Sequence, residues 1–263
     1  MRRLRVGVQV RPQHTTYASM RGCWLRCEEL GVDVLYTWDH FFPLSGDPNG
    51  PHFECWSLLA AMAEVTERVE FGALVLCNSY RNPALLSNMA KTVDHISGGR
   101  LILGIGAGWF ERDYIEYGYE FGTAGDRLRA LGRALPIIKE RWRKDNPPPV
   151  RNPIPILIGG GGEKVTLKLT ALHADLWNGG AGPDRLAHKN AVLNDWCARV
   201  GRDPAAIERT TGIDQADTER PDLLDQLVAA GADQLILRLG EPWDFDAVRR
   251  LVAWRDARNR DRG

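Results

Sequence analysis

The feature that most constrains the fold is a regular alternation of short apolar runs with longer segments of helical spacing, sustained along the whole chain. The runs expected to be strands are 4–10, 32–38, 69–76, 100–105, 156–159, 175–178, 208–213 and 234–238. The segments expected to be helices are 17–30, 54–66, 83–96, 124–143, 163–172, 183–200, 222–230 and 245–258. About eight β/α units in 263 residues predict a (β/α)8 TIM-type barrel with few insertions, in preference to an open doubly wound sheet.

Composition narrows the class further. No composition break divides the chain, so we expect one domain over residues 1–263, with the proline-rich stretch 146–155 as a loop. The 34 basic and 34 acidic residues argue against a nucleic-acid-binding surface, and no apolar run approaches the ~20 residues that span a bilayer. The basic N-terminus lacks a following hydrophobic segment, and the five cysteines form no CxxC pair, so we expect a cytoplasmic protein with reduced thiols.

A barrel places its active site at the carboxyl ends of the strands. Asp39 and His40 follow the second expected strand and would put a carboxylate and a group that titrates near neutrality at the barrel mouth. The alternative is a capping aspartate beside a loop histidine.

Polar residues and glycines end the next two strands. Asn78 is suited to hydrogen-bond the edge of a flat heterocycle, whereas Cys77 has no identifiable base beside it and is interpreted as a packing residue. Glycines 104, 106 and 108 remove side chains where the backbone passes close to something flat or crowded. Their spacing departs from the G-x-G-x-x-G dinucleotide pattern, so a Rossmann site is not predicted.

Four glycines, 159–162, end the fifth strand before a helix expected to start near Glu163. Exposed amides and a positive helix end favour a phosphate cradle; the alternative is a tight turn. The chain lacks a lysine at an expected strand end and any metal-ligand cluster of the HxH or HExxH kind. The pattern therefore predicts chemistry carried by a bound cofactor, with no metal site.

These motifs together resemble the luciferase-like (bacterial luciferase) superfamily of flavin and deazaflavin oxidoreductases, most closely its coenzyme F420-dependent branch. The stretches that carry the resemblance, in family order, are 36–41, 81–83, 91–100, 103–109, 155–160, 174–178 and 235–239.

The resemblance implies a barrel that holds a flat deazaflavin, F420, at its mouth and passes a hydride at C5. His40 would face the substrate as the proton partner, and relatives carry a non-proline cis peptide at the position of Leu74-Val75. The residues implied to bind the cofactor are Asp39, Leu74, Val75, Asn78, Gly106, Ala107, Gly108, Trp109, Gly160, Gly161 and Gly162. A homodimer and a small-molecule substrate are expected, as is usual in the superfamily.

One departure bears on the substrate. Sugar-phosphate dehydrogenase relatives carry an acidic residue where this chain has Trp109, so their acid/base arrangement does not transfer whole, and Trp109 suggests a more apolar pocket. The alternatives to an F420-dependent enzyme are an FMN-dependent monooxygenase of the same superfamily, a non-catalytic flavin- or deazaflavin-binding protein, and a barrel isomerase that needs no cofactor.

Overall fold

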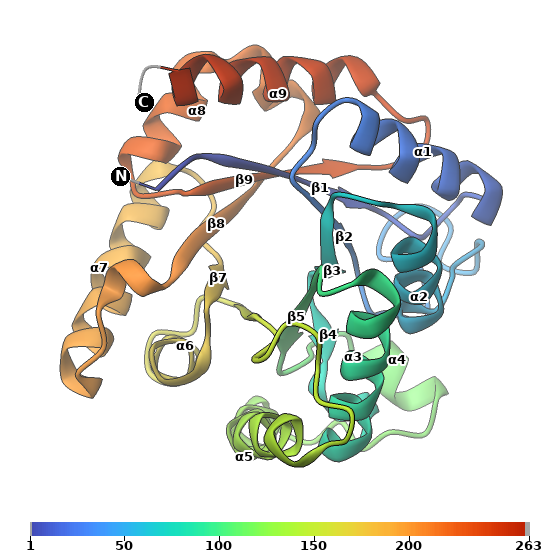
Figure 1. The fold of residues 1–263 in the computed structure, drawn as a ribbon, viewed down its shortest axis with the longest axis vertical. Coiled ribbons are helices and arrows are strands. Elements are labelled where there is room, and N and C mark those ends of the chain that lie inside the picture. The colour runs from blue at the N-terminus through green and yellow to red at the C-terminus, as the bar shows by residue number, and fades with distance from the viewer. Residues whose placement is uncertain (1, 261–263) are drawn as a thin grey trace.

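The computed structural model describes residues 2–260 and contains a closed ring of parallel strands surrounded by helices (Figure 1). The strands are β1 (Arg5–Val10), β2 (Val34–Thr37), β3 (Glu70–Ala73), β4 (Leu76–Cys77), β5 (Leu101–Gly106), β6 (Ile156–Gly159), β7 (Leu176–Asn178), β8 (Glu208–Ile213) and β9 (Gln234–Leu239). Neighbouring strands pair in the order β3-β2-β1-β9-β8-β7-β6-β5-β4, and a further pairing of β3 with β5 closes the ring. The predicted (β/α)8 barrel is confirmed.

The third barrel strand is interrupted. The expected strand 69–76 forms as two pieces, β3 and β4, both of which pair with β5. Between them the Leu74-Val75 peptide bond is cis, as the resemblance implied. The break lies at the carboxyl end of the barrel, where the chain turns into the short 3-10 helix η1 (Asn78–Tyr80).

Helices cover the outside of the ring (Figure 1). They are α1 (Tyr17–Glu29), α2 (Cys55–Val65), α3 (Pro83–Ser97), α4 (Glu111–Glu116), α5 (Ala124–Lys144), α6 (Thr166–His173), α7 (Pro183–Val200), α8 (Pro221–Ala229) and α9 (Phe245–Arg260), with 3-10 turns η2 (Pro204–Ala206) and η3 (Gln215–Glu219). The short helix α4 was not predicted, because six residues do not show helical periodicity. Helix α6 begins three residues later than the expected start at Glu163.

The barrel interior is packed. Side chains of Val34, Tyr36, Ile102, Leu157, Leu176 and Ile236 fill it and are at most 4% exposed. At the amino end of the strands, Arg5 pairs with Glu70 and Glu208. The interior below the mouth is therefore a core and not a channel.

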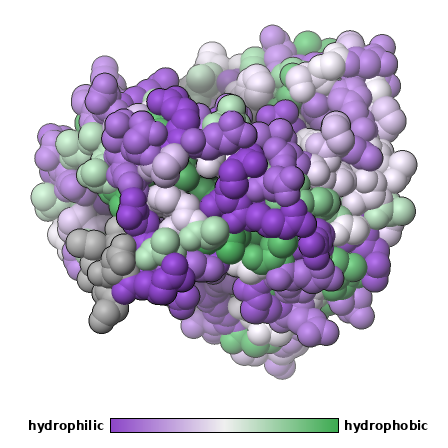
Figure 2. Space-filling view, turned by 90° about the horizontal axis from the view of Figure 1, so that it is seen from above, coloured by the Kyte–Doolittle hydropathy of each residue, from purple (hydrophilic) through white to green (hydrophobic). Residues whose placement is uncertain are grey.

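One face of the outer surface, shown in Figure 2, is largely hydrophilic, with hydrophobic residues in separate patches. No helix within residues 2–260 has both the length and the apolar character required to cross a membrane. The two ends of the chain lie together, since the side-chain oxygen of Asn259 accepts from the amide of Leu4 at 2.9 Å.

Candidate active site

A cavity of about 560 Å³ opens at the carboxyl ends of the strands. That volume lies in the range of small-molecule and cofactor sites. The lining comes from β1, from the segment after β2, from the broken strand β3–β4 and η1, from the ends of β5, β6 and β7, from the segments after β5 and β6, and from helices α5 and α6. The lining residues are Gln9, Trp38, Asp39, His40, Leu44, Leu74, Val75, Leu76, Cys77, Tyr80, Gly106, Ala107, Gly108, Trp109, Ala124, Arg127, Leu128, Gly159, Gly160, Thr166 and Asn178.

The floor of the cavity is built around the cis peptide. The side-chain amide of Gln9 donates to the carbonyl oxygen of Leu74 at 2.9 Å, which ties the broken strand to β1. A Cβ on Gly106 or on Gly159 would approach the Val75 side chain within 2.8 and 2.9 Å respectively. These two glycines therefore make room for Val75, the residue that forms the floor.

Gly108 is required by the protein's own packing. Its φ is +84°, and an added Cβ would overlap the Tyr114 hydroxyl and the Cys77 sulfur. Burial raises the pKa of the Cys77 thiol, although a hydrogen bond with Tyr114 opposes the shift. The thiol is consequently protonated near neutrality and packs beside the cavity, in keeping with the sequence interpretation.

The Asp39 carboxylate is bonded to other groups of the protein. Its side chain is buried, and it forms a bidentate pair with Arg81 at 2.6 and 3.0 Å while accepting from the Cys77 amide at 2.9 Å. Burial raises the pKa of Asp39, and the Arg81 contacts oppose that rise. Asp39 lines the cavity, but its oxygens hold the loop after β2 to the segment after β4.

His40 points to a different carboxylate. Its Nδ1 lies 2.7 Å from the Oδ2 of Asp113, which is fully buried in the first turn of α4. The other ring nitrogen, Nε2, has no hydrogen-bond partner within residues 2–260, and His40 lines the cavity. Nε2 is thus the nitrogen available to a ligand.

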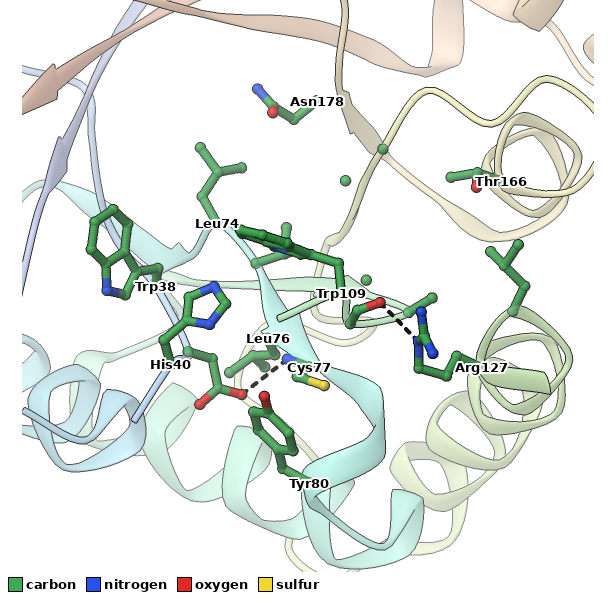
Figure 3. A pocket seen from close by; sticks show the side chains of 18 of the residues that line it. Trp38, His40, Leu74, Leu76, Cys77, Tyr80, Trp109, Arg127, Thr166 and Asn178 are labelled. Atoms are coloured by element: carbon green, nitrogen blue, oxygen red, sulfur yellow. Dashed lines mark hydrogen bonds between the residues drawn. The ribbon is translucent and has the colours of Figure 1, made fainter. Parts of the chain in front are cut away.

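Aromatic rings surround His40. Trp38, Trp109 and Phe110 present their edges or faces to it, with ring centroids 6.2, 5.7 and 5.5 Å away. Trp109 is 63% exposed although it lines the cavity, so it lies at the rim as an apolar cover (Figure 3). The Trp38 indole donates to His52 Nε2 at 2.9 Å. Burial, together with the nearby His40, lowers the pKa of His52 to about 4, so His52 is a neutral acceptor.

Arg127 supplies a cation on the opposite side of the cavity from His40 (Figure 3). Its Nε donates to Gly108 O at 3.1 Å, and its Nη1 donates to Phe121 O and Gly122 O at 2.9 and 3.1 Å. These acceptors are all neutral carbonyls. No carboxylate of residues 2–260 pairs with Arg127, and Nη2 has no acceptor there. A buried guanidinium that lines a cavity, lies over the Phe121 ring and has no carboxylate partner in the described chain suits an anionic group.

Thr166, which follows the glycine turn after β6, lies on the same side of the cavity as Arg127 (Figure 3). Gly160 and Thr166 line the cavity, and the amide N–H groups of Gly161 and Gly162 donate no hydrogen bond within the described chain. Glu163 lies in the turn before α6, and its carboxylate is bonded to Lys189 and His188 at 2.6 and 2.9 Å. The turn is three residues longer than expected.

Nine of the twelve residues predicted from the sequence line this cavity. They are Asp39, His40, Leu74, Val75, Gly106, Ala107, Gly108, Trp109 and Gly160. Asn78, Gly161 and Gly162 are not among the lining residues. Asn78 lies in η1 and is buried at 8% exposure, and its contact with a ring edge stays a prediction. Asn178, at the end of β7, lines the cavity.

Sequence reasoning assigned no role to Gln9, Tyr80, Asp113, Arg127 or Thr166. Gln9 and Tyr80 lie in the strand-end segments to which the barrel rule points, whereas Thr166 is the first residue of α6. Asp113 and Arg127 lie within helices that follow the fourth barrel strand by several residues, so only the tertiary structure brings them to the mouth.

Comparison with known proteins identifies the family of this chain. The family model described as luciferase-like monooxygenase matches residues 4–234. An F420-dependent glucose-6-phosphate dehydrogenase of Amycolatopsis mediterranei is 35% identical over 46% of this chain, a match that spans 37% of that protein.

Two solved structures share the fold. An F420-dependent secondary alcohol dehydrogenase in complex with an F420-acetone adduct has a TM-score of 0.82 and 16% identity, covering 95% of this chain and 98% of that one. The FMN-bound oxygenating constituent of 3,6-diketocamphane monooxygenase from Pseudomonas putida has a TM-score of 0.73 and 15% identity, covering 96% and 97%. With the barrel, the cis peptide and the family match in agreement, the chain belongs to the luciferase-like monooxygenase family.

Proposed function

We propose that this protein is an F420-dependent oxidoreductase that moves a hydride between the deazaflavin and a small organic substrate. The main support for the proposal is that the cavity has a different polar group at each of its two ends. His40 Nε2 is available at one end. The guanidinium of Arg127, which has no carboxylate partner within residues 2–260, lies at the other, on the side of Thr166 (Figure 3). A cofactor with a flat ring and a phosphate would place its ring near His40 and its phosphate near Arg127.

The residues present fit such a cofactor. Leu74 and Val75 offer an apolar support for the ring, and Trp109 covers the rim. Arg127, Thr166 and the free amides of the glycine turn suit the phosphate. When bound, the deazaflavin supplies hydride exchange at C5.

The chain itself supplies proton handling and exclusion of water. A neutral His40 has the Nε2 lone pair to accept a proton from a substrate that loses a hydride, and the imidazolium returns it in the reverse direction. Trp38 and Trp109 flank the imidazole and keep the reacting groups in apolar surroundings. The apolar rim favours a substrate less polar than a sugar phosphate.

Relatives support F420, and one solved neighbour supports the alternative. The Amycolatopsis enzyme and the secondary alcohol dehydrogenase are described as F420-dependent. The camphane monooxygenase constituent binds FMN, which shares the ring shape and the phosphate. An FMN-dependent monooxygenase is therefore the second candidate.

Calorimetric titration of the purified apoprotein with each cofactor tests whether the protein binds F420 or FMN. We expect F420 to bind with micromolar or tighter affinity and FMN to bind more weakly. Micromolar FMN binding without F420 binding would establish the second candidate instead.

A second experiment tests catalysis. The F420-loaded protein is incubated with a panel of alcohols, ketones and enones while deazaflavin absorbance is followed. Hydride transfer to or from one class supports the enzyme. Tight binding with no turnover across the panel supports a non-catalytic binding protein, and conversion without added cofactor supports an isomerase. The homodimer and the cytoplasmic location stay predictions.

A further inference from the structure

The Asp113 carboxylate accepts three hydrogen bonds in a fully buried position. His40 Nδ1 and the Tyr80 hydroxyl meet Oδ2 at 2.7 and 3.0 Å, and the Phe41 amide donates to Oδ1 at 3.1 Å. The Asp113 side chain is 0% exposed. Both of its oxygens are therefore used within the protein, and neither is left for a ligand.

Two of these three partners are donors by their chemistry. A backbone amide can only donate. Burial, with additional contributions from Cys77 and Asp113, raises the pKa of the Tyr80 phenol, so the hydroxyl keeps its proton and donates. His40 Nδ1 is the third partner. Because the oxygens of a carboxylate can only accept hydrogen bonds, Nδ1 must carry the proton and donate it to Asp113.

The neighbouring carboxylate cannot replace Asp113. Asp39 precedes His40 in the chain, but its oxygens are bonded to Arg81 and to the Cys77 amide. Within residues 2–260, Asp113 is the acid bonded to the His40 ring.

We propose that Asp113 is a positioning residue for His40: it holds the proton of the neutral imidazole on Nδ1 and thereby presents an unprotonated Nε2 to the cavity. The inference rests on the proposed function, because it takes His40 as the proton partner of the substrate.

Asp113→Asn reverses the expected tautomer. The amide keeps one oxygen, which the Phe41 N–H requires, and turns its NH₂ group toward His40 and Tyr80. His40 Nδ1 must then accept, which moves the proton of the neutral ring to Nε2. The same loss of the productive tautomer follows Asp-to-Asn exchange in the Ser-His-Asp triad.

The tautomer can be read directly. Protein labelled with ¹⁵N in its histidine rings is followed by long-range proton–nitrogen correlation spectra over a pH series, and the signals are read where the His40 ring is neutral. Spectra of His40→Gln assign the His40 signals. We expect the wild-type protein to favour Nδ1–H by about tenfold or more, and Asp113→Asn to favour Nε2–H by a similar factor.

Tyr80→Phe is the matched control, since it removes another donor to the same oxygen and leaves the Asp113 carboxylate in place. It should keep the wild-type Nδ1–H form. The remaining histidines report whether each variant is folded. A wild-type His40 that carries its proton on Nε2 would overturn the proposal even if Asp113→Asn fails to fold.

An unchanged Nδ1–H form in folded Asp113→Asn would also overturn it. The spectra need no cofactor, so this test is separate from the cofactor titrations. Failure to bind F420 would refute the proposed function and leave the tautomer result standing.

Discussion

Asp39 and His40 are adjacent in the chain, yet their side chains are bonded to different segments. Asp39 pairs with Arg81 after η1, whereas His40 pairs with Asp113 in α4. The two adjacent residues therefore have separate roles. Asp39 holds the loop after β2 against the barrel, and His40 is oriented by Asp113.

Replacement of His40 tests the proton-transfer role. In His40→Asn, the side-chain amide can still donate to Asp113, but nothing occupies the position of Nε2. We expect turnover to fall by about 10²–10⁴ while F420 affinity is retained, because a positioned general base contributes about that factor. Turnover with the substrate found in the panel and a binding titration provide the two measurements. Unchanged turnover would remove His40 from the mechanism.

The Asp39–Arg81 pair is expected to act on stability. Asp39→Leu removes the bidentate partner of the largely buried Arg81 and leaves Glu54 as its remaining carboxylate, so it should lower the free energy of unfolding by up to about 3–5 kcal/mol. Urea denaturation measures this, and the double variant Asp39→Leu/Arg81→Met should lose less than the sum of the single variants. If Asp39→Leu instead keeps full stability and loses only F420 binding, Asp39 contacts the cofactor directly.

Arg127 is expected to bind the phosphate. Arg127→Met should weaken F420 binding by about 10–100-fold, since a hydrogen bond to a charged group contributes about 1.5–3 kcal/mol. Binding of the phosphate-free deazaflavin riboside should change little, which separates loss of the anion contact from distortion of the loop that Arg127 supports.

Arg129→Met on the same helix is the matched control for Arg127, because Arg129 is exposed and pairs with Asp126. It should bind F420 as the wild type does. Equal weakening of both ligands by Arg127→Met would contradict a phosphate role.

His52 introduces a pH dependence of stability. Its pKa is about 4 in the folded chain against an ordinary value of 6.5, so the unfolded chain binds more protons between these values. Stability is complete above pH 6.5 and falls as the pH drops toward 4. The loss from this group is about 2 kcal/mol at pH 5.

His52→Gln removes the titration and keeps an acceptor for the Trp38 indole. The difference in free energy of unfolding between wild type and variant should therefore change by about 2 kcal/mol between pH 7.5 and pH 5, as measured by urea denaturation at each pH. A constant difference across that range would show that His52 titrates normally.

Gly108 is expected to tolerate no side chain. Gly108→Ala places a Cβ against the Tyr114 hydroxyl and the Cys77 sulfur at a φ of +84°. Gly118 has a φ of +71° with no atom near an added Cβ, so Gly118→Ala incurs the backbone strain alone. Gly108→Ala should lose about 1–3 kcal/mol more stability than Gly118→Ala in thermal or urea unfolding. Equal losses would mean that the crowding at Gly108 relaxes freely.

Much of the fold was predictable because its signals are local. Apolar runs and helical spacing located the eight barrel strands, and nine of the residues implied by the family resemblance line one cavity. The differences arise where the chain departs from regular geometry. The strand expected over 69–76 forms as two pieces, the short helix α4 follows β5, and the glycine turn extends to Val165 before α6 begins.

The sequence by itself determined the barrel, the family and the residues that end each strand, since periodicity and motifs are written in neighbouring positions. Only the tertiary structure decided which partner each charged group takes. His40 lies 73 positions from Asp113, and Arg127 follows β5 at the far side of the mouth. Such pairings depend on how loops and helices close over the barrel. That closure depends on packing among segments far apart in the sequence, which local sequence patterns do not predict.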